Sequence, residues 1–365
     1  MQTVFIHLGE AKVSHLKLNI ERHLLDFPDN QVTLILNNRK TLPSIKHKNF
    51  ELYWYKGDST FNSLWNNMIL DNNFRKGFWR FSLERLFAII EYQNSIKVDK
   101  ILHIESDVLL FSGFPWKKFQ DLNKLSWCRY NAVRDVSSLL LIPNIESGNW
   151  LKEKMYEELS RRKNLTDMML LSIISHKYED RIFILPSISA QIDEMVNSKS
   201  LMNDHERKTI TLGEEYFGGI FDPAAIGMWL AGQDPRNYYG LTRYRTEEII
   251  ESGDSYIDPA ALQYKVQSNL ELFSNSTKIP VKIWNLHVHS KNNKLFLSDW
   301  EVELKRIAER NKKSKYLSDF NSKLLLTLLR ENLSQGTFMR YVIGFPPLRN
   351  FLKPLIYLIK KFVKR

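Results

Sequence analysis

Short apolar runs and amphipathic stretches alternate along the first third of the chain. Residues 13–25 and 78–92 place apolar side chains at helical spacing. Around them lie β-rich runs, at residues 3–8, 31–36, 50–55 and 100–105. Strands that alternate with helices in this order form a mostly parallel sheet with helices packed on its faces. The pattern therefore predicts an α/β fold.

The middle of the chain is more mixed. Predicted strands and helices there cover residues 138–142, 150–161, 167–176 and 181–185, and Asp167 caps the second helix. Residues 194–212 are polar and weakly patterned, which predicts a loop. We expect residues 1–300 to form the catalytic domain and residues 301–365 to form a basic, helical C-terminal extension.

Composition is that of an ordinary globular protein. The chain has 365 residues, of which 43% are hydrophobic and 25% charged. The single Cys128 excludes a disulfide framework and a cysteine-rich zinc site, and it fits a reducing compartment. The first residues resemble a strand rather than a signal peptide, and no apolar run is long enough to span a membrane. These features predict a cytoplasmic location.

The net charge of +11 is concentrated at the C-terminus. From Glu301 onward the chain has fifteen Lys or Arg residues against five Asp or Glu residues. The preceding residues are therefore close to neutral. Because a nucleic-acid binder usually spreads basic residues over its binding face, this distribution argues against a nucleic-acid partner.

Apolar and basic positions of the tail follow a helical spacing. Leu355, Ile359 and Phe362 fall on one side of a helix that begins near residue 354, while Lys360 and Lys364 fall away from that side. Such a helix can lie in the interface of an anionic membrane, and the alternative is that it packs against the body of the protein. We expect a peripheral association with the membrane.

Two carboxylates follow the apolar run at residues 101–104. Glu105 and Asp107 flank Ser106, which faces the other way if strand alternation continues. In open α/β sheets, ligands collect beyond the carboxyl ends of the strands. Neighbouring acids repel unless a cation neutralises them, and Mg²⁺ or Mn²⁺ prefers oxygen ligands and often holds phosphates. The motif predicts a divalent-metal site; the alternative is a strand end whose acids pair with Lys or Arg.

A glycine pair precedes a second candidate carboxylate. Gly218 and Gly219 lie just before Asp222 and Pro223, and Gly232 suits the end of a helix that starts there. Asp222 is either a helix N-cap or a general base beside backbone that approaches a ligand.

Two histidines and a lysine lie on a later extended segment. Alternation puts His287 and His289 on the same side, and imidazole is a common ligand for manganese-like cations. One of the two histidines is expected to be structural. Lys291 is placed to meet a phosphate as a point charge.

Basic residues also occur on the helix before the acidic strand. Arg80 and Glu84 are one turn apart, next to Arg85, and such a pair is more often a surface ion pair than a phosphate clamp. No Gly-x-Gly-x-x-Gly follows the first strand and no Walker sequence is present. Their absence argues against dinucleotide dehydrogenases and P-loop NTPases.

The ordered set of motifs resembles GT-A-fold nucleotide-sugar glycosyltransferases, in particular bacterial and viral members that assemble polysaccharides. Glu105-Ser106-Asp107 looks like the family's Asp-x-Asp signature, and residues 78–85 are similar to the segment before it. Gly218-Gly219 ahead of Asp222 resembles the glycine loop and acceptor-side acid. His287 or His289 stands where the family places a metal-ligand histidine. The resemblance covers residues 1–300 and implies a GT-A-like, Rossmann-type sheet.

The resemblance implies roles for these residues. Asp107 and a histidine, with His289 slightly preferred, would hold Mn²⁺ or Mg²⁺. Asp222 would be the base of an inverting transfer, with Gly218 and Gly219 on the acceptor side. The expected donor-binding residues are His7, Gly9, Arg80, Arg85, Glu105, Ser106 and Lys291.

Two positions depart from the family pattern, and two other function classes stay open. Glu105 replaces the first Asp of the signature, and Phe221 stands where many members have Glu. The expected substrates are a nucleotide-sugar donor, UDP-sugar by first guess, and a glycan or lipid-linked saccharide acceptor. The alternatives are a metal-dependent phosphotransferase or hydrolase and a non-catalytic glycan-binding protein.

Overall fold

A computed structural model describes residues 1–10, 13–72, 74–198, 200, 202–232, 255–274 and 280–316. The amphipathic helix predicted near residues 354–364, and most of the predicted C-terminal extension, lie outside these residues. Within the described part, no helix is both long enough and apolar enough to cross a membrane.

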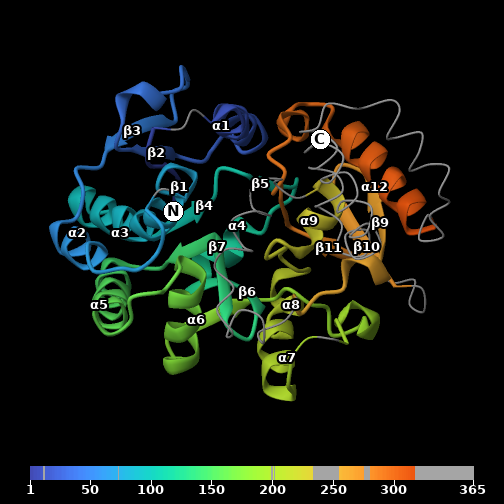
Figure 1. Ribbon diagram of the computed structural model, residues 1–365. Helices are drawn as coiled ribbons and strands as arrows, with labels where there is room; N and C mark the ends of the chain where they lie inside the picture. Colours follow the sequence, from blue (N-terminus) through green and yellow to red (C-terminus); the bar gives the residue numbers. More distant parts are fainter. Residues whose placement is uncertain are drawn as a thin grey trace, which may run out of the picture.

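A seven-stranded sheet forms the centre of the molecule, with strand order β3-β2-β1-β4-β7-β6-β8 (Figure 1). All neighbouring strands pair in parallel except on the two sides of β7, where pairing is antiparallel. The prediction of a mostly parallel α/β sheet is confirmed. The strands are β1 (Gln2–His7), β2 (Val32–Leu36), β3 (Phe50–Trp54), β4 (Ile101–Ile104), β6 (Leu125–Asn131), β7 (Arg134–Ile142) and β8 (Ile182–Leu185).

Helices pack against the sheet and against each other (Figure 1). The predicted helices that begin near residues 13, 78, 150 and 167 are all present. The helices are α1 (Ser14–Asp26), α2 (Ser59–Trp65), α3 (Phe78–Ile96), α4 (Trp116–Asp121), α5 (Ile145–Arg161), α6 (Asp167–Lys177), α7 (Asp204–Thr211), α8 (Glu214–Phe217), α9 (Ala225–Ala231) and α12 (Trp300–Tyr316).

Alternation along β4 divides the interior into two hydrophobic cores. Ile101 belongs to one core, together with Leu86 of α3 and Met155 of α5. Leu102 belongs to the other, together with Ile20 of α1. Because successive strand residues point to opposite faces, each face of the sheet buries its own set of helices. This double burial explains why β4 is apolar except at His103, which is buried as well.

Two small sheets, separate from the main sheet, involve the later part of the chain. Strand β5 (Val108–Leu110), directly after the acidic motif, pairs antiparallel with β12 (Asn285–His287), which places His287 opposite Val108. The other sheet has the order β11-β10-β9. Its strands are β9 (Gln263–Val266), β10 (Leu270–Phe273) and β11 (Val281–Ile283).

The loop predicted for residues 194–212 is wrong over its second half. Helix α7 forms there, and the Asn203 side chain caps it by accepting a hydrogen bond from the backbone N–H of Glu206. The buried residues of this helix are Glu206 and Ile210. Because Ile210 is the one apolar residue among these two, the helix has no recurring apolar positions in its sequence, which explains the error.

Candidate functional site

The site begins where β4 ends at the carboxyl edge of the parallel strands. The backbone N–H of Glu105 still bonds Ser138 of β7 at 3.0 Å, and the N–H of Val108 turns back to the Glu105 carbonyl at 3.0 Å. The Asn19 amide of α1 donates to the Ser106 and Val108 carbonyls at 3.0 and 2.8 Å. This bonding fixes the turn, so Glu105 and Asp107 are both held at the edge of the sheet.

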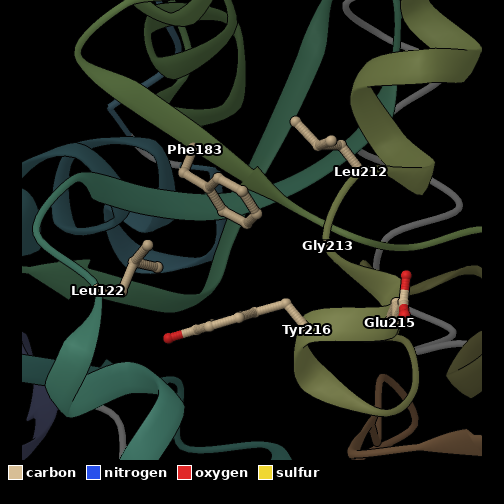
Figure 2. A pocket seen from close by; sticks show the side chains of 6 residues that line it. All are labelled: Leu122, Phe183, Leu212, Gly213, Glu215 and Tyr216. Atoms are coloured by element: carbon tan, nitrogen blue, oxygen red, sulfur yellow. The ribbon is translucent and has the colours of Figure 1, made fainter.

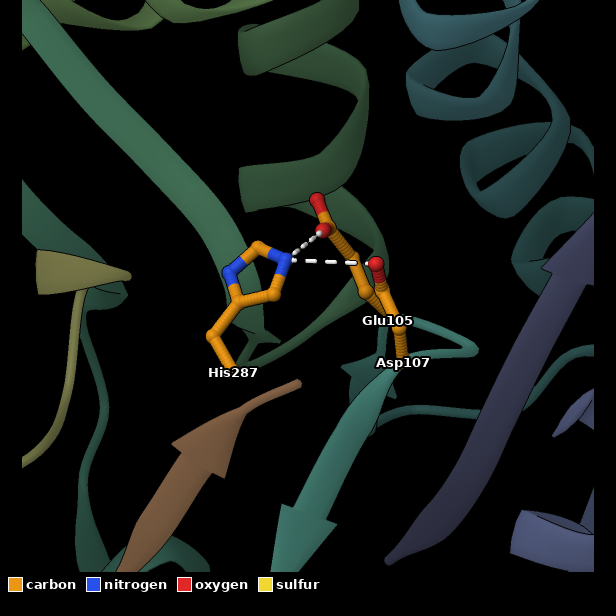
Figure 3. A group of neighbouring side chains, drawn as sticks. All are labelled: Glu105, Asp107 and His287. Carbon is orange, nitrogen blue, oxygen red and sulfur yellow. Dashed lines mark ion pairs between the residues drawn. The ribbon is translucent and has the colours of Figure 1, made fainter. Parts of the chain in front are cut away.

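His287 completes a cluster with the two carboxylates (Figure 3). One ligand atom from each of Glu105, Asp107 and His287 lies within 4.8 Å of the other two, and all three side chains are buried. The imidazole Nε2 is 3.5 Å from Glu105 Oε2 and 3.5 Å from Asp107 Oδ2. Of the two candidate histidines, the structure therefore brings His287 to the carboxylates. The preference for His289 is corrected.

The geometry of this cluster fits a divalent cation. A separation of 3.5 Å between Nε2 and each carboxylate oxygen is longer than a normal hydrogen bond. Atoms that each lie about 2.1 Å from one ion are themselves separated by roughly 3 to 3.5 Å. Two carboxylates and an imidazole are a donor set that accepts manganese-like ions. Among the residues described, this is the group of His, Cys, Asp and Glu side chains close enough to hold a metal.

Basic residues balance the charge of the two acids. The Lys291 Nζ is 2.9 Å from Asp107 Oδ2. Burial alone would raise the pKa of Asp107, but Lys291 and His287 hold it well below its usual range. Burial likewise disfavours the charged form of His287, yet the neighbouring Asp107 and Glu105 raise its pKa to about 9. A bound cation would therefore compete with the His287 proton and with the Lys291 ammonium.

Lys291 is held over the cluster in an unusual backbone conformation. Its φ is 57°, in the left-handed region that residues other than glycine seldom adopt. Non-glycine residues in this region are enriched at functional sites, where the surrounding structure maintains the strain. The expectation that Lys291 belongs to the site agrees with this geometry.

Arg85 binds the other side of Glu105. Its Nη2 is 2.6 Å from Glu105 Oε1 and 2.6 Å from Asp167 Oδ2 on helix α6. Ser137 of β7 lies within hydrogen-bond distance of both Glu105 and Arg85, at 3.3 and 3.1 Å. Arg85 was expected to bind the donor, whereas in this structure its guanidinium orients Glu105. Asp167 and Ser137 are site residues that the sequence analysis missed.

Arg80 takes the more common of its two predicted roles. Its guanidinium bonds Glu84 at 3.2 Å and Asn62 at 2.6 Å. The structure pairs Arg80 with Glu84 and Asn62, and its donor-binding role stays a prediction.

The end of β1 and Ser106 lie beside the acidic turn. Because β1 and β4 are parallel neighbours, His7 ends its strand at the same edge as Glu105. Gly9 has a φ of 97°, and a Cβ at this position would lie 2.6 Å from the Phe81 ring. Its N–H bonds the Asn37 side chain at 2.8 Å. Ser106 faces away from the cluster, with its Oγ 3.3 Å from His15 Nε2.

Asp222 is a buried carboxylate that binds the backbone of two elements. Its side chain is fully buried, and each oxygen accepts two backbone N–H groups. Two of these donors are Gly227 at 2.8 Å, in α9, and His287 at 3.0 Å, in β12. Burial raises the pKa of Asp222, although these N–H groups oppose the rise. The described contacts of the carboxylate are all with backbone, and the base role of Asp222, with the inversion that it implies, stays a prediction.

The glycine pair also serves packing. Gly218 ends α8 with a φ of 67°. A Cβ at Gly219 would lie 2.6 Å from the backbone oxygen of Lys282, so glycine is required for this segment to pair with β11. The backbone at Gly219 does approach another group closely, as predicted, but that group is the Lys282 backbone and not a ligand. The predicted helix at Asp222 and Pro223 begins later, at Ala225.

A hydrophobic pocket of about 390 Å³ lies beside strand β8 and helix α8 (Figure 2). Phe183, Leu212 and Tyr216 are among its lining residues, and none of the lining residues belongs to the carboxylate–histidine cluster. The cluster, rather than this pocket, contains the groups that can carry chemistry.

Comparison with known proteins gives matches at the level of fold only. No protein-family model and no curated protein matches the chain. An active-site mutant of LgtC, a galactosyltransferase, shares 14% identity over 58% of this chain and 83% of its own, with a TM-score of 0.39. Mouse xyloside xylosyltransferase 1 shares 8% identity over 51% and 84%, with a TM-score of 0.37. The PaToxG glycosyltransferase shares 14% identity over 49% and 69%, with a TM-score of 0.33.

Proposed function

We propose that this protein is a metal-dependent glycosyltransferase that uses a nucleotide-diphosphate sugar, with UDP-sugar as the first candidate. The observation that carries the proposal is the buried cluster of Glu105, Asp107 and His287 at the carboxyl edge of a mostly parallel sheet. Ligands of such sheets bind at this edge. The motif order that resembles GT-A enzymes supports the same function.

The residues in and around the cluster would have separate roles in donor binding. Glu105, Asp107 and His287 would hold Mn²⁺ or Mg²⁺, which when bound supplies a Lewis acid that offsets the charge on the leaving diphosphate. Lys291 can turn from Asp107 to a phosphate oxygen, because its long side chain has three rotatable donors. Arg85 keeps Glu105 in place by binding the Oε1 atom of its carboxylate. His7 and Gly9 would flank the nucleobase at the end of β1.

The acceptor is proposed to be a glycan or a lipid-linked saccharide. The basic amphipathic tail would hold the enzyme at an anionic membrane, where a lipid-linked acceptor is located. Gly218 and Gly219 belong to the acceptor side of this proposal.

Binding of nucleotide diphosphates with and without Mn²⁺ tests the proposal. We expect Mn²⁺ to strengthen UDP binding at least 100-fold in isothermal titration, and we expect Asp107→Asn and His287→Ala to abolish that gain. Asp193→Asn is the matched control, because the Asp193 side chain is 83% exposed and lies outside the cluster. UDP binding that is unaffected by Mn²⁺ and by both cluster variants would overturn the metal assignment.

Product analysis with UDP-sugars then separates transfer from the alternative reactions. A transferase forms a new glycoside and releases UDP, whereas a phosphotransferase or hydrolase transfers or releases phosphate. A non-catalytic glycan-binding protein would yield neither product. Formation of glycoside that requires Asp107 and His287 is the expected result.

A further inference from the structure

A second pocket, of about 380 Å³, opens between the turn of the β6–β7 hairpin and helix α6. Met169 and Ile173 of α6 give it an apolar wall. Three basic side chains also line it, from Arg134, Arg162 and His176, and no acidic side chain does. A pocket with an apolar wall and convergent basic groups is suited to an organic molecule that carries an anion.

Arg134 lacks a partner in this pocket. Its side chain is partly buried and makes no hydrogen bond or ion pair with any residue that the structure describes. Burial lowers its pKa. Arg129, on the other strand of the hairpin, is more deeply buried but bonds Asp135 at 3.0 Å and Glu206 at 2.8 Å. The fold thus neutralises one arginine of the hairpin and leaves the other open toward the pocket.

The other two basic groups, His176 and Arg162, each have a carboxylate partner. His176 Nε2 is 2.8 Å from Glu206 Oε1, and this bond raises the pKa of His176. The Arg162 side chain is 54% exposed, with its Nε 3.8 Å from Glu158. The Arg162 side chain is half-exposed and this contact is long, while Glu158 also pairs with Arg161 and Lys177, so Arg162 can reorient toward an anion at little cost.

Strand β7 and helix α6, which line the pocket, also contribute residues that support the metal cluster. Ser137 bonds Glu105 and lies three residues after Arg134 on β7, a distance of about 10 Å along an extended strand. Asp167, the first residue of α6, holds the Arg85 guanidinium that contacts Glu105. Residues 169–176 of the same helix contribute to the pocket.

We propose that this pocket binds the anionic group of the acceptor, a carboxylate or phosphate on a saccharide, with Arg134 as its principal ligand. This reading rests on the proposed transferase function for the identity of the acceptor. A guanidinium offers a planar fork that matches either anion. The apolar wall at Met169 and Ile173 would pack against the face of the sugar ring.

Titration of the full-length protein with three monosaccharides tests the pocket. We expect glucuronate or glucose 6-phosphate to bind at least 10-fold more tightly than glucose, and the tighter of the two identifies the anion. Arg134→Gln should reduce the affinity for the anionic sugar to the affinity for glucose. Arg134→Lys should retain part of the difference between the two affinities. Arg161→Gln is the matched control, because Arg161 also pairs with Glu158 but does not line the pocket.

Two outcomes would overturn the proposal for this pocket. One is equal affinity for glucose and both anionic sugars, and the other is an affinity for the anionic sugar that Arg134→Gln does not change. Misfolding is checked by thermal unfolding, and Arg134→Gln should not lower the Tm, since it breaks no bond to a described residue. Mn²⁺-dependent UDP binding is measured on the same samples and should persist in Arg134→Gln. If the wild type does not bind UDP, the transferase proposal fails and the pocket remains an anionic-sugar site without an assigned acceptor, whereas if it binds UDP but no anionic sugar, the pocket proposal alone fails.

Discussion

At the level of single residues, His287 determines how the cluster responds to pH. Its pKa is about 9 in the folded protein, against an ordinary value of 6.5. A raised pKa stabilises the folded state fully below about pH 6.5, and this contribution is lost as pH rises through about 9. At about 1.4 kcal/mol for each pKa unit, the loss is on the order of 3 kcal/mol.

We therefore predict that the metal-free protein becomes less stable between pH 6.5 and 9. Urea unfolding in EDTA at several pH values measures the effect, and His287→Gln should remove most of the slope. Added Mn²⁺ should act in the opposite direction, because binding needs the neutral imidazole and so strengthens as pH rises. Equal slopes in the wild type and in His287→Gln would contradict the assigned pKa.

Several site residues could be predicted from the sequence because they are local. Glu105 and Asp107 adjoin an apolar strand, and the alternation of residues 287–291 marked the second segment. The choice of His287 over His289 depends on strand pairing across 179 positions, from Val108 to His287, which no local pattern encodes. Asp167 was predicted as a helix cap because an acid in a first turn has that ordinary explanation.

At the level of elements, Asp222 connects helix α9 to strand β12. Replacing it with Asn puts an amide NH₂ against backbone N–H groups that now donate to a carboxylate oxygen. We predict that Asp222→Asn lowers the free energy of unfolding by about 2 to 4 kcal/mol, the cost of unsatisfied buried donors. Chemical denaturation measures this loss. Asp193→Asn, at an exposed carboxylate, should change the stability by less than about 0.5 kcal/mol.

The same substitution separates the two roles considered for Asp222. A structural carboxylate predicts that Mn²⁺ and UDP binding weaken together with stability, because β12 carries His287. A catalytic base predicts a stable protein with normal donor binding and no transfer. The second result would support the base role.

Elements with polar interiors escaped the sequence analysis. Strand β6 buries Ser126, Arg129 and Asn131, so its apolar run is interrupted. Arg129 is satisfied only by groups brought in from β7, α6 and α7, including Asp135, Ser175 and Glu206. Because these partners lie up to 77 positions away, the buried network is a property of the folded chain. Strands with apolar interiors, such as β1, β2 and β4, were predicted correctly.

At the level of the whole molecule, the net positive charge of the chain lies mostly in its last 65 residues. We predict that removing residues 338–365 releases the protein from vesicles that contain anionic lipid, since the deleted segment carries the basic amphipathic pattern. Co-sedimentation with phosphatidylserine vesicles measures this release, and neutral vesicles are the control. Mn²⁺-dependent UDP binding should survive the deletion. Co-sedimentation that is unchanged by the deletion would contradict membrane attachment through the tail.

The pairing of β5 with β12 gives the site a kinetic property. Asp107 and Lys291 lie 184 positions apart. The segment between them includes strands β6, β7 and β8 of the main sheet. During synthesis, the ribosome releases the acidic turn long before the strand that completes the cluster. A nascent chain halted before residue 280 therefore lacks the histidine and the lysine that balance its two carboxylates. On the proposed function, cation affinity would develop late in biogenesis, and a terminated or clipped polypeptide would bind neither the metal nor the donor.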